Sequence, residues 1–170
     1  MKKIVSLLLL AFLFTGAFVN AQTYKFGHIE SQNVVIEMEA YEDARDSLNA
    51  VRTKYDQQAE RMQVEINRKY NELVEQQNTL DSLILESMYG EIQSMQERLQ
   101  NFQTQATQKL RTLEGQLLEG VMMKLETAVT EVAEELDLIY VFDVSGRNPI
   151  YASDQSIDVA PMVREKLGIE

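Results

Sequence analysis

Residues 48–73 have the sequence LNAVRTKYDQQAERMQVEINRKYNEL, and the spacing of their apolar side chains decides the fold. These side chains recur at steps of three or four residues: Leu48, Val51, Tyr55, Ala59, Met62, Ile66, Tyr70 and Leu73. From Leu48 to Tyr70 six steps cover 22 residues, a period of 3.67 that is close to one α-helical turn. The stretch therefore predicts a nearly straight helix with one narrow apolar seam.

A second apolar seam follows in residues 88–136, again at steps of three or four residues. Its members are Met88, Ile92, Met95, Leu99, Phe102, Ala106, Leu110, Leu113, Leu117, Val121, Leu125, Ala128, Val132 and Leu136. Glu, Gln, Leu, Met, Arg and Lys, all good helix formers, dominate residues 31–137. Two long helices that each carry one seam are expected to pack on each other.

The segment 79–90 (TLDSLILESMYG) separates the two seams, and the single apolar stripe is lost there. Asp81, two serines and Gly90 are turn or cap residues. The arms on either side, 32–80 and 88–136, have 49 residues each. The sequence therefore predicts an antiparallel helical hairpin over residues 31–137, with its tip near residues 80–90. The alternative is one continuous helix of 105 residues.

The segments outside the hairpin have a different composition. Residues 24–29 (YKFGHI) and 138–144 (LIYVFDV) are rich in β-branched and aromatic residues and predict strands. Residues 150–152 predict a third short strand, and Asp158 is expected to cap a short helix that ends at Leu167. The expected fold class is mostly α with a small β part: a long hairpin on a small β-rich body formed by residues 22–30 and 138–170.

This β-rich body is expected to need other subunits. It has about 40 residues, and domains of that size rarely stand alone without disulfides, metal or oligomerisation. The chain has no cysteine. The strand at 138–144 is apolar on both faces, so another subunit is expected to cover one of them. Five residues are the candidates for the subunit contacts of the body: Phe26, Ile29, Leu138, Tyr140 and Phe142.

The first 21 residues have the pattern of a cleavable signal peptide. Lys2 and Lys3 precede a short apolar run, and small residues follow up to Ala21. A membrane anchor is the alternative, but it requires about 20 consecutive apolar residues. Without cysteine the chain also lacks the residue that carries the lipid of a bacterial lipoprotein. The sequence therefore predicts export and cleavage after Ala21.

Charge and chemistry narrow the possible functions. Removal of residues 1–21 takes away two of 16 basic residues and leaves 14 − 27 = −13, which disfavours nucleic acid and anionic lipid as partners. His28 is the only histidine, and its neighbours suggest neither a metal site nor a nucleophile. No glycine-rich phosphate loop is present. The sequence therefore predicts a protein that is not an enzyme and that needs no cofactor or metal.

Three short motifs, in this order around a helical hairpin, resemble those of the Skp/OmpH family of periplasmic chaperones. Residues 24–35 (YKFGHIESQNVV) are similar to the opening strand of the family and its entry into the first helix. Residues 132–143 (VAEELDLIYVFD) are similar to the "A-x-E-x-x-Y-D-x-V-x-D" strand entry. Residues 150–159 (IYASDQSIDV) are similar to the "L-Y-A-x-x-x-x-D-I-T" ending. The resemblance covers residues 22–170.

The resemblance implies a homotrimer in which strands from three subunits form the body and three hairpins surround a cavity. It implies an ATP-independent holdase in the periplasm that binds unfolded outer-membrane β-barrel proteins. Family members are often basic, which helps them attract acidic clients and lipopolysaccharide. Residues 31–137 here carry 10 basic and 21 acidic side chains, and this departure argues against contact with lipopolysaccharide or membrane.

Within the hairpin, we expect the tip to contact the bound protein. Leu83, Ile84, Leu85, Met88 and Tyr89 lie where the apolar spacing breaks, so the hairpin has little against which to bury them. Seam residues such as Met62 and Met95 are expected to form the core of the hairpin instead. The alternative function is a structural coiled-coil protein that acts as a scaffold of the cell envelope.

Overall fold

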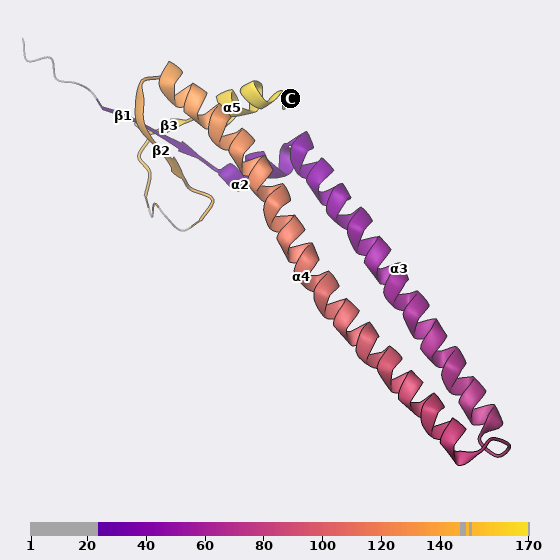
Figure 1. Cartoon of the computed structure of the whole chain (residues 1–170). Helices are drawn as coiled ribbons and strands as arrows, with labels where there is room; N and C mark the ends of the chain where they lie inside the picture. The colour runs from indigo at the N-terminus through magenta and orange to yellow at the C-terminus, as the bar shows by residue number, and fades with distance from the viewer. Residues whose placement is uncertain (1–23, 147–148, 150, 170) are drawn as a thin grey trace, which may run out of the picture.

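The computed structural model describes residues 24–146, 149 and 151–169. The predicted signal peptide therefore lies outside the described residues. The elements follow in the order β1 (Lys25–Ile29), α2 (Ser31–Glu37), α3 (Glu39–Gln76), α4 (Ser82–Glu135), β2 (Leu138–Asp143), β3 (Ile157–Asp158) and α5 (Ala160–Leu167). The long helices α3 and α4 run side by side away from a small body that contains the three strands and α5 (Figure 1). The predicted fold class, mostly α with a small β part, is confirmed.

The hairpin has two unequal arms. At 1.5 Å per residue, α3 with 38 residues is ~57 Å long and α4 with 54 residues is ~80 Å long. The additional length of α4 runs past the start of α3 into the body (Figure 1). A continuous helix through residues 32–136 is therefore wrong, and the expected equal arms of 49 residues are also wrong.

The turn of the hairpin occupies residues 77–81, between α3 and α4. Thr79 N and Leu80 N donate to the carbonyl of Gln76, and the Asp81 side chain accepts from Leu83 N at 2.8 Å. Asp81 is therefore the N-cap of α4, as its residue type indicates. Gly90, expected as a turn or cap residue, lies inside α4. A single glycine costs a helix only about 1 kcal/mol, which is too little to end it.

The other departure from the predicted hairpin is a break at Met38, between α2 and α3. Its backbone is extended, with φ −72° and ψ 130°, whereas the sequence predicted a helix that continues from residue 31. The Met38 side chain is buried in the core of the body. The break allows α2 to pack against both α4 and α5 while α3 leaves the body along α4.

The three strands form a parallel sheet with the order β2-β1-β3. An irregularity after Lys25 sets the register, so that Phe26 pairs with Tyr140 and His28 with Phe142. The predicted strand at residues 150–152 is wrong for its described residues, Tyr151 and Ala152. The third strand is Ile157–Asp158, which pairs with Gly27 and His28.

The apolar core has two separate parts. One lies in the body and joins α2, α4, α5 and the sheet; its buried members include Ile29, Val34, Val132, Val159 and Val163. The other lies in the distal arm and consists of Ile66, Leu73, Ile92 and Leu99. The predicted seams therefore form the contact between α3 and α4. None of the helices within the described residues has the length and apolar character that a membrane span requires.

Candidate functional site

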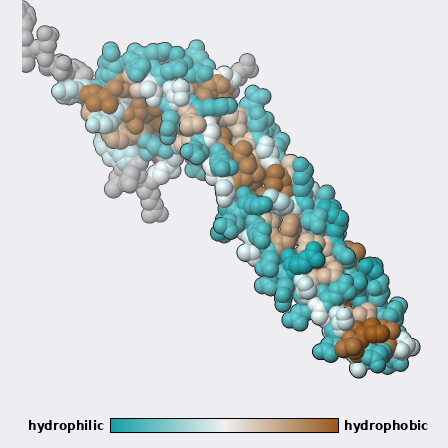
Figure 2. Space-filling model, in the orientation of Figure 1, coloured by the Kyte–Doolittle hydropathy of each residue, from teal (hydrophilic) through white to brown (hydrophobic). Residues whose placement is uncertain are grey.

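An aromatic cluster covers the outer face of the sheet. The Phe26 ring stacks on the Tyr140 ring with a centroid distance of 6.5 Å, and Phe142 lies 6.4 Å from Phe26 and 5.9 Å from Tyr140. These side chains nevertheless stay 41%, 61% and 45% exposed. A contiguous aromatic surface of this kind is typical of an interface with another molecule. The apolar side chains on this part of the molecule are visible in Figure 2.

Two of the five predicted subunit-contact residues do not belong to this face. Ile29 is buried in the core of the body, and Leu138 is half-buried against it. The opposite face of the sheet is close-packed, because a Cβ on Gly27 would lie 2.8 Å from Leu138 Cδ1 and 3.3 Å from Val141 Cγ2. Ile29 and Leu138 therefore support the sheet from within the chain, while Phe26, Tyr140 and Phe142 face outward.

A hollow of about 450 Å³ continues the aromatic face toward the C-terminal part of the chain. Tyr24, Phe26, Phe142 and Tyr151 are among its lining residues. His28 also lines it, with Nδ1 2.9 Å from Ser156 Oγ. Neither Tyr24 nor Tyr151 was predicted from the sequence as a site residue. Their aromatic side chains within the predicted strands at 24–29 and 150–152 were the signal that could have identified them.

The tip of the hairpin exposes part of the predicted contact set. Leu83, Ile84 and Tyr89 are 73%, 48% and 56% exposed in the first turns of α4. Leu85 and Met88 are half-buried, and Met88 packs against the core of the distal arm. Tyr70 and Val74, at the end of α3, are also exposed, although Tyr70 was expected in the seam. The space-filling view shows an apolar patch at this end of the molecule (Figure 2).

Charge changes sign along the hairpin. Its middle, residues 45–69 of α3 and 98–111 of α4, contains nine basic and four acidic side chains. The distal part, residues 70–97, contains six acidic side chains and no basic one. Lys69 links the two zones through an ion pair with Glu91, with a distance of 2.9 Å from Nζ to Oε1. The overall acidic composition therefore conceals a basic zone in the middle of the arm.

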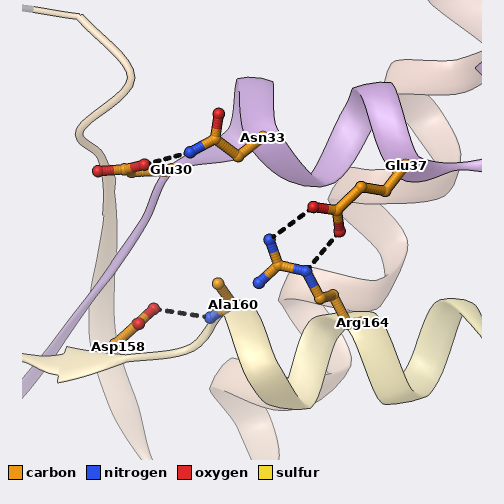
Figure 3. A network of polar contacts seen from close by, with 6 residues as sticks. All are labelled: Glu30, Asn33, Glu37, Asp158, Ala160 and Arg164. Atoms are coloured by element: carbon orange, nitrogen blue, oxygen red, sulfur yellow. Dashed lines mark hydrogen bonds and ion pairs between the residues drawn. The ribbon is translucent and has the colours of Figure 1, made fainter. Parts of the chain in front are cut away.

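Ion pairs fasten α5 to the base of the hairpin. Arg164 contacts Glu37 of α2 with both Nε (2.6 Å) and Nη2 (3.3 Å), and Lys166 Nζ lies 2.6 Å from Glu135 Oε1 of α4 (Figure 3 shows the Arg164 contacts). The hydrogen bond from Arg164 holds the pKa of Glu37 below its ordinary value of 4.5. At the start of α5, Asp158 Oδ1 accepts from Ala160 N at 2.9 Å. This clamp connects α5 to α2 and to the last turn of α4.

Asp143 organises the end of β2. Its carboxylate accepts hydrogen bonds from Ser31 N and Oγ and from Ser145 N. Partial burial raises the pKa of Asp143, but the hydrogen bonds from Ser31 and Ser145 outweigh it and lower the pKa overall. These bonds tie the end of β2 to the start of α2. Within the described part of the chain, no group of three or more His, Cys, Asp or Glu residues is arranged to hold a metal ion.

The comparisons with known proteins agree with this architecture. The sequence matches the family profile described as "Outer membrane protein (OmpH-like)" over residues 25–167. A solved structure of an OmpH-like protein from Caulobacter crescentus CB15, described as a candidate outer membrane chaperone, is similar in fold, with a TM-score of 0.75 at 14% sequence identity. The similarity covers 87% of this chain and 86% of that one. The search against curated proteins found no match. The family profile spans the sheet, both arms and α5, and the chain therefore belongs to the OmpH-like family.

Proposed function

We propose that this protein is an ATP-independent holdase chaperone of the periplasm that binds unfolded outer-membrane β-barrel proteins and prevents their aggregation. The observation that carries the proposal is the placement of exposed apolar surface at both ends of a long polar hairpin. One surface, the aromatic face of the sheet, suits assembly. The other, the tip, suits contact with an unfolded chain. Membership of the OmpH-like family and the chaperone-like structural neighbour support this assignment.

Assembly would use the aromatic face. In a homotrimer, Phe26, Tyr140 and Phe142 of each subunit would be covered by the other two, which would remove the exposed aromatic surface from water. Strand β2 lies at one edge of the sheet, so its outer backbone groups can pair with a strand of another subunit. Three hairpins that leave such a body would surround a cavity for the client.

Client contact would occur at the tips and along the inner walls of the arms. Leu83, Ile84 and Tyr89 are the most accessible of the five tip residues. Leu85 and Met88 would contribute less, because both are already partly buried in the hairpin. Weak contacts with apolar and uncharged polar side chains can hold many sequences without selecting one. Binding and release by such contacts require neither a nucleotide nor a catalytic group.

The alternative, a scaffold of the cell envelope, would polymerise through apolar seams that remain open. In this chain α3 and α4 cover each other's seam, and Ile66, Leu73, Ile92 and Leu99 are buried within the hairpin. This observation favours the holdase.

The experiment is the refolding of a urea-denatured outer-membrane β-barrel protein by dilution, with turbidity as the measurement. We expect the protein to keep the client in solution without ATP. A variant with serine at positions 83, 84 and 89 should protect less well, while Val64→Ser, at an exposed site on the arm, serves as the control. If the wild-type protein does not change the turbidity, the holdase function is contradicted and the scaffold function remains as the alternative.

A further inference from the structure

The distal part of the hairpin combines exposed apolar side chains with charge of one sign. Between Lys69 and Arg98 the chain has no basic residue and six acidic residues. Two of the six are paired within the arm: Glu72 with Arg68, and Glu91 with Lys69. Asp81 caps α4. The remaining carboxylates are therefore the ones available to a ligand.

Glu75 and Glu86 are the two available carboxylates closest to the apolar patch in the sequence. Both are exposed, and neither forms an ion pair with a basic side chain of the described residues. Glu75 follows the exposed Val74 at the end of α3, and Glu86 lies between Ile84 and Tyr89 at the start of α4. The patch therefore has an uncompensated carboxylate on each of the two helices that form it.

We propose that the tip takes apolar segments of an unfolded chain that carry lysine or arginine beside the apolar residues. The apolar side chains of the segment would cover Leu83, Ile84 and Tyr89, and its cations would lie near Glu75 and Glu86. This inference rests on the proposed function, because it names which part of a client the tip receives. Acidic segments would instead be favoured by the basic zone in the middle of the arm.

Charge also decides against other occupants of the patch. Two tips would each bring the same six carboxylates, so a second copy of the chain would be repelled at the distance needed to cover apolar side chains. Anionic lipid is disfavoured for the same reason. A basic, apolar segment satisfies both features of the surface at once. The attraction between exposed charges is modest and is screened by salt, so it would bias the choice of segment and add little to total affinity.

The test compares two fluorescent peptides that share an alternating core of Leu, Val and Tyr and carry either lysine or glutamate at their ends. Binding to the purified wild-type protein is measured by anisotropy at low and at high salt. We expect the lysine peptide to bind about 5-fold more tightly than the glutamate peptide at low salt, the effect of two exposed charge pairs. This ratio should shrink toward one in the double variant Glu75→Gln/Glu86→Gln and in high salt.

The control is Glu114→Gln/Glu119→Gln, which removes the same charge from exposed positions near the base of the arm. It should keep the preference for lysine. Replacement of Leu83, Ile84 and Tyr89 by serine should weaken binding of both peptides. Equal binding of the two peptides to the wild type, together with normal protection of a denatured porin, would overturn this inference and leave the holdase intact.

Failure of both peptides to bind, together with failure to protect the porin, would overturn both proposals. The same variants test the other two occupants by light scattering and by co-sedimentation with vesicles that contain anionic lipid. The wild-type protein could associate with itself or with the vesicles, and the tip serine variant could lose that association. This result would assign the patch to a second copy of the chain or to anionic lipid, respectively, and would overturn the inference.

Discussion

Gly27 and Gly115 show how differently two glycines of one chain respond to an added methyl group. A Cβ on Gly27 would lie 2.8 Å from Leu138 Cδ1 and 3.1 Å from Val159 Cγ1, so an added methyl group would force these side chains to shift. A Cβ on Gly115 would meet no atom of the described chain within 4 Å. A glycine inside a helix costs stability relative to alanine, but the sequence alone does not say whether a neighbouring helix requires Gly115. Within the described residues, no neighbouring helix requires it.

The first prediction uses this pair. Gly115→Ala should raise the free energy of unfolding by about 1 kcal/mol, because alanine is the better helix former and the new methyl group has space. Gly27→Ala should lower it, because the new Cβ would overlap Leu138. Urea unfolding followed by circular dichroism measures both. A less stable Gly115→Ala protein would mean that another subunit's helix approaches this position.

A second prediction at this scale concerns pH. The hydrogen bond with Arg164 lowers the pKa of Glu37. The ionised form of Glu37 therefore stabilises the folded state more than the protonated form does. This contribution to stability is present above the ordinary value of 4.5 and is lost as the pH falls through the lowered pKa. The melting temperature of the wild type should therefore fall in acid by more than that of Glu37→Gln. An identical pH dependence would show that the clamp adds no stability.

At the scale of elements, the two long helices were predictable because their apolar seams repeat over many turns. The ends of the elements were less predictable, since each depends on a few local contacts. The break at Met38 comes from burial of one side chain in the body, which no repeat indicates. Strand β3 has only two residues, and its pairing with Gly27 and His28 leaves no pattern in the sequence. The tip was predicted near residues 80–90, whereas the turn lies at residues 77–81 and Leu85 and Met88 are half-buried in α4.

The third prediction separates the seam from the tip. Ile66→Ala and Leu99→Ala should each cost about 2–5 kcal/mol, because both side chains are buried between α3 and α4. Serine at positions 83, 84 and 89 should leave the melting temperature nearly unchanged, because these side chains are already exposed. Thermal unfolding of the three proteins measures the difference. An equal loss of helix in the tip variant would identify the tip residues as packing residues.

At the scale of the whole molecule, the sequence predicted that the body needs other subunits, and the structure adds which surface they would cover. The sequence showed a strand apolar on both faces. It could not tell which face another chain would cover, because that depends on the irregularity after Lys25 and on close packing at Gly27. With this strand register and this close packing, Phe26, Tyr140 and Phe142 lie on the exposed face of the sheet.

The fourth prediction follows from this placement. Phe142→Asp should leave the chain helical but prevent formation of the proposed trimer, because an unpaired charge buried at its interface would cost about 3–5 kcal/mol. Val64→Asp, at an exposed position on the arm, should still assemble. Light scattering gives the mass of each protein. Normal trimers of Phe142→Asp would place the subunit contact elsewhere.

The fifth prediction concerns salt. Without residues 1–21 each subunit carries 14 − 27 = −13 charges, so the subunits repel one another and should associate more tightly as salt screens this repulsion. A dilution series at low and high salt, followed by light scattering, measures the change in the dissociation constant. A wild-type protein that stays monomeric at micromolar concentration under both conditions would contradict the proposed trimer.

The parallel pairing of β1 with β2 also constrains the order of folding. These neighbouring strands are separated by residues 30–137, and a parallel pair needs such a crossover. Closing a flexible loop of that length costs about 2–3 kcal/mol more entropy than closing a loop of a few residues. Formation of the hairpin from its turn brings the start of α3 beside Leu117 and Leu118 of α4 beforehand, which shortens the loop that remains to be closed and removes part of this cost. The arm would therefore fold first, and a newly made chain would keep β1 without its partner strand until β2, which follows α4, had been made.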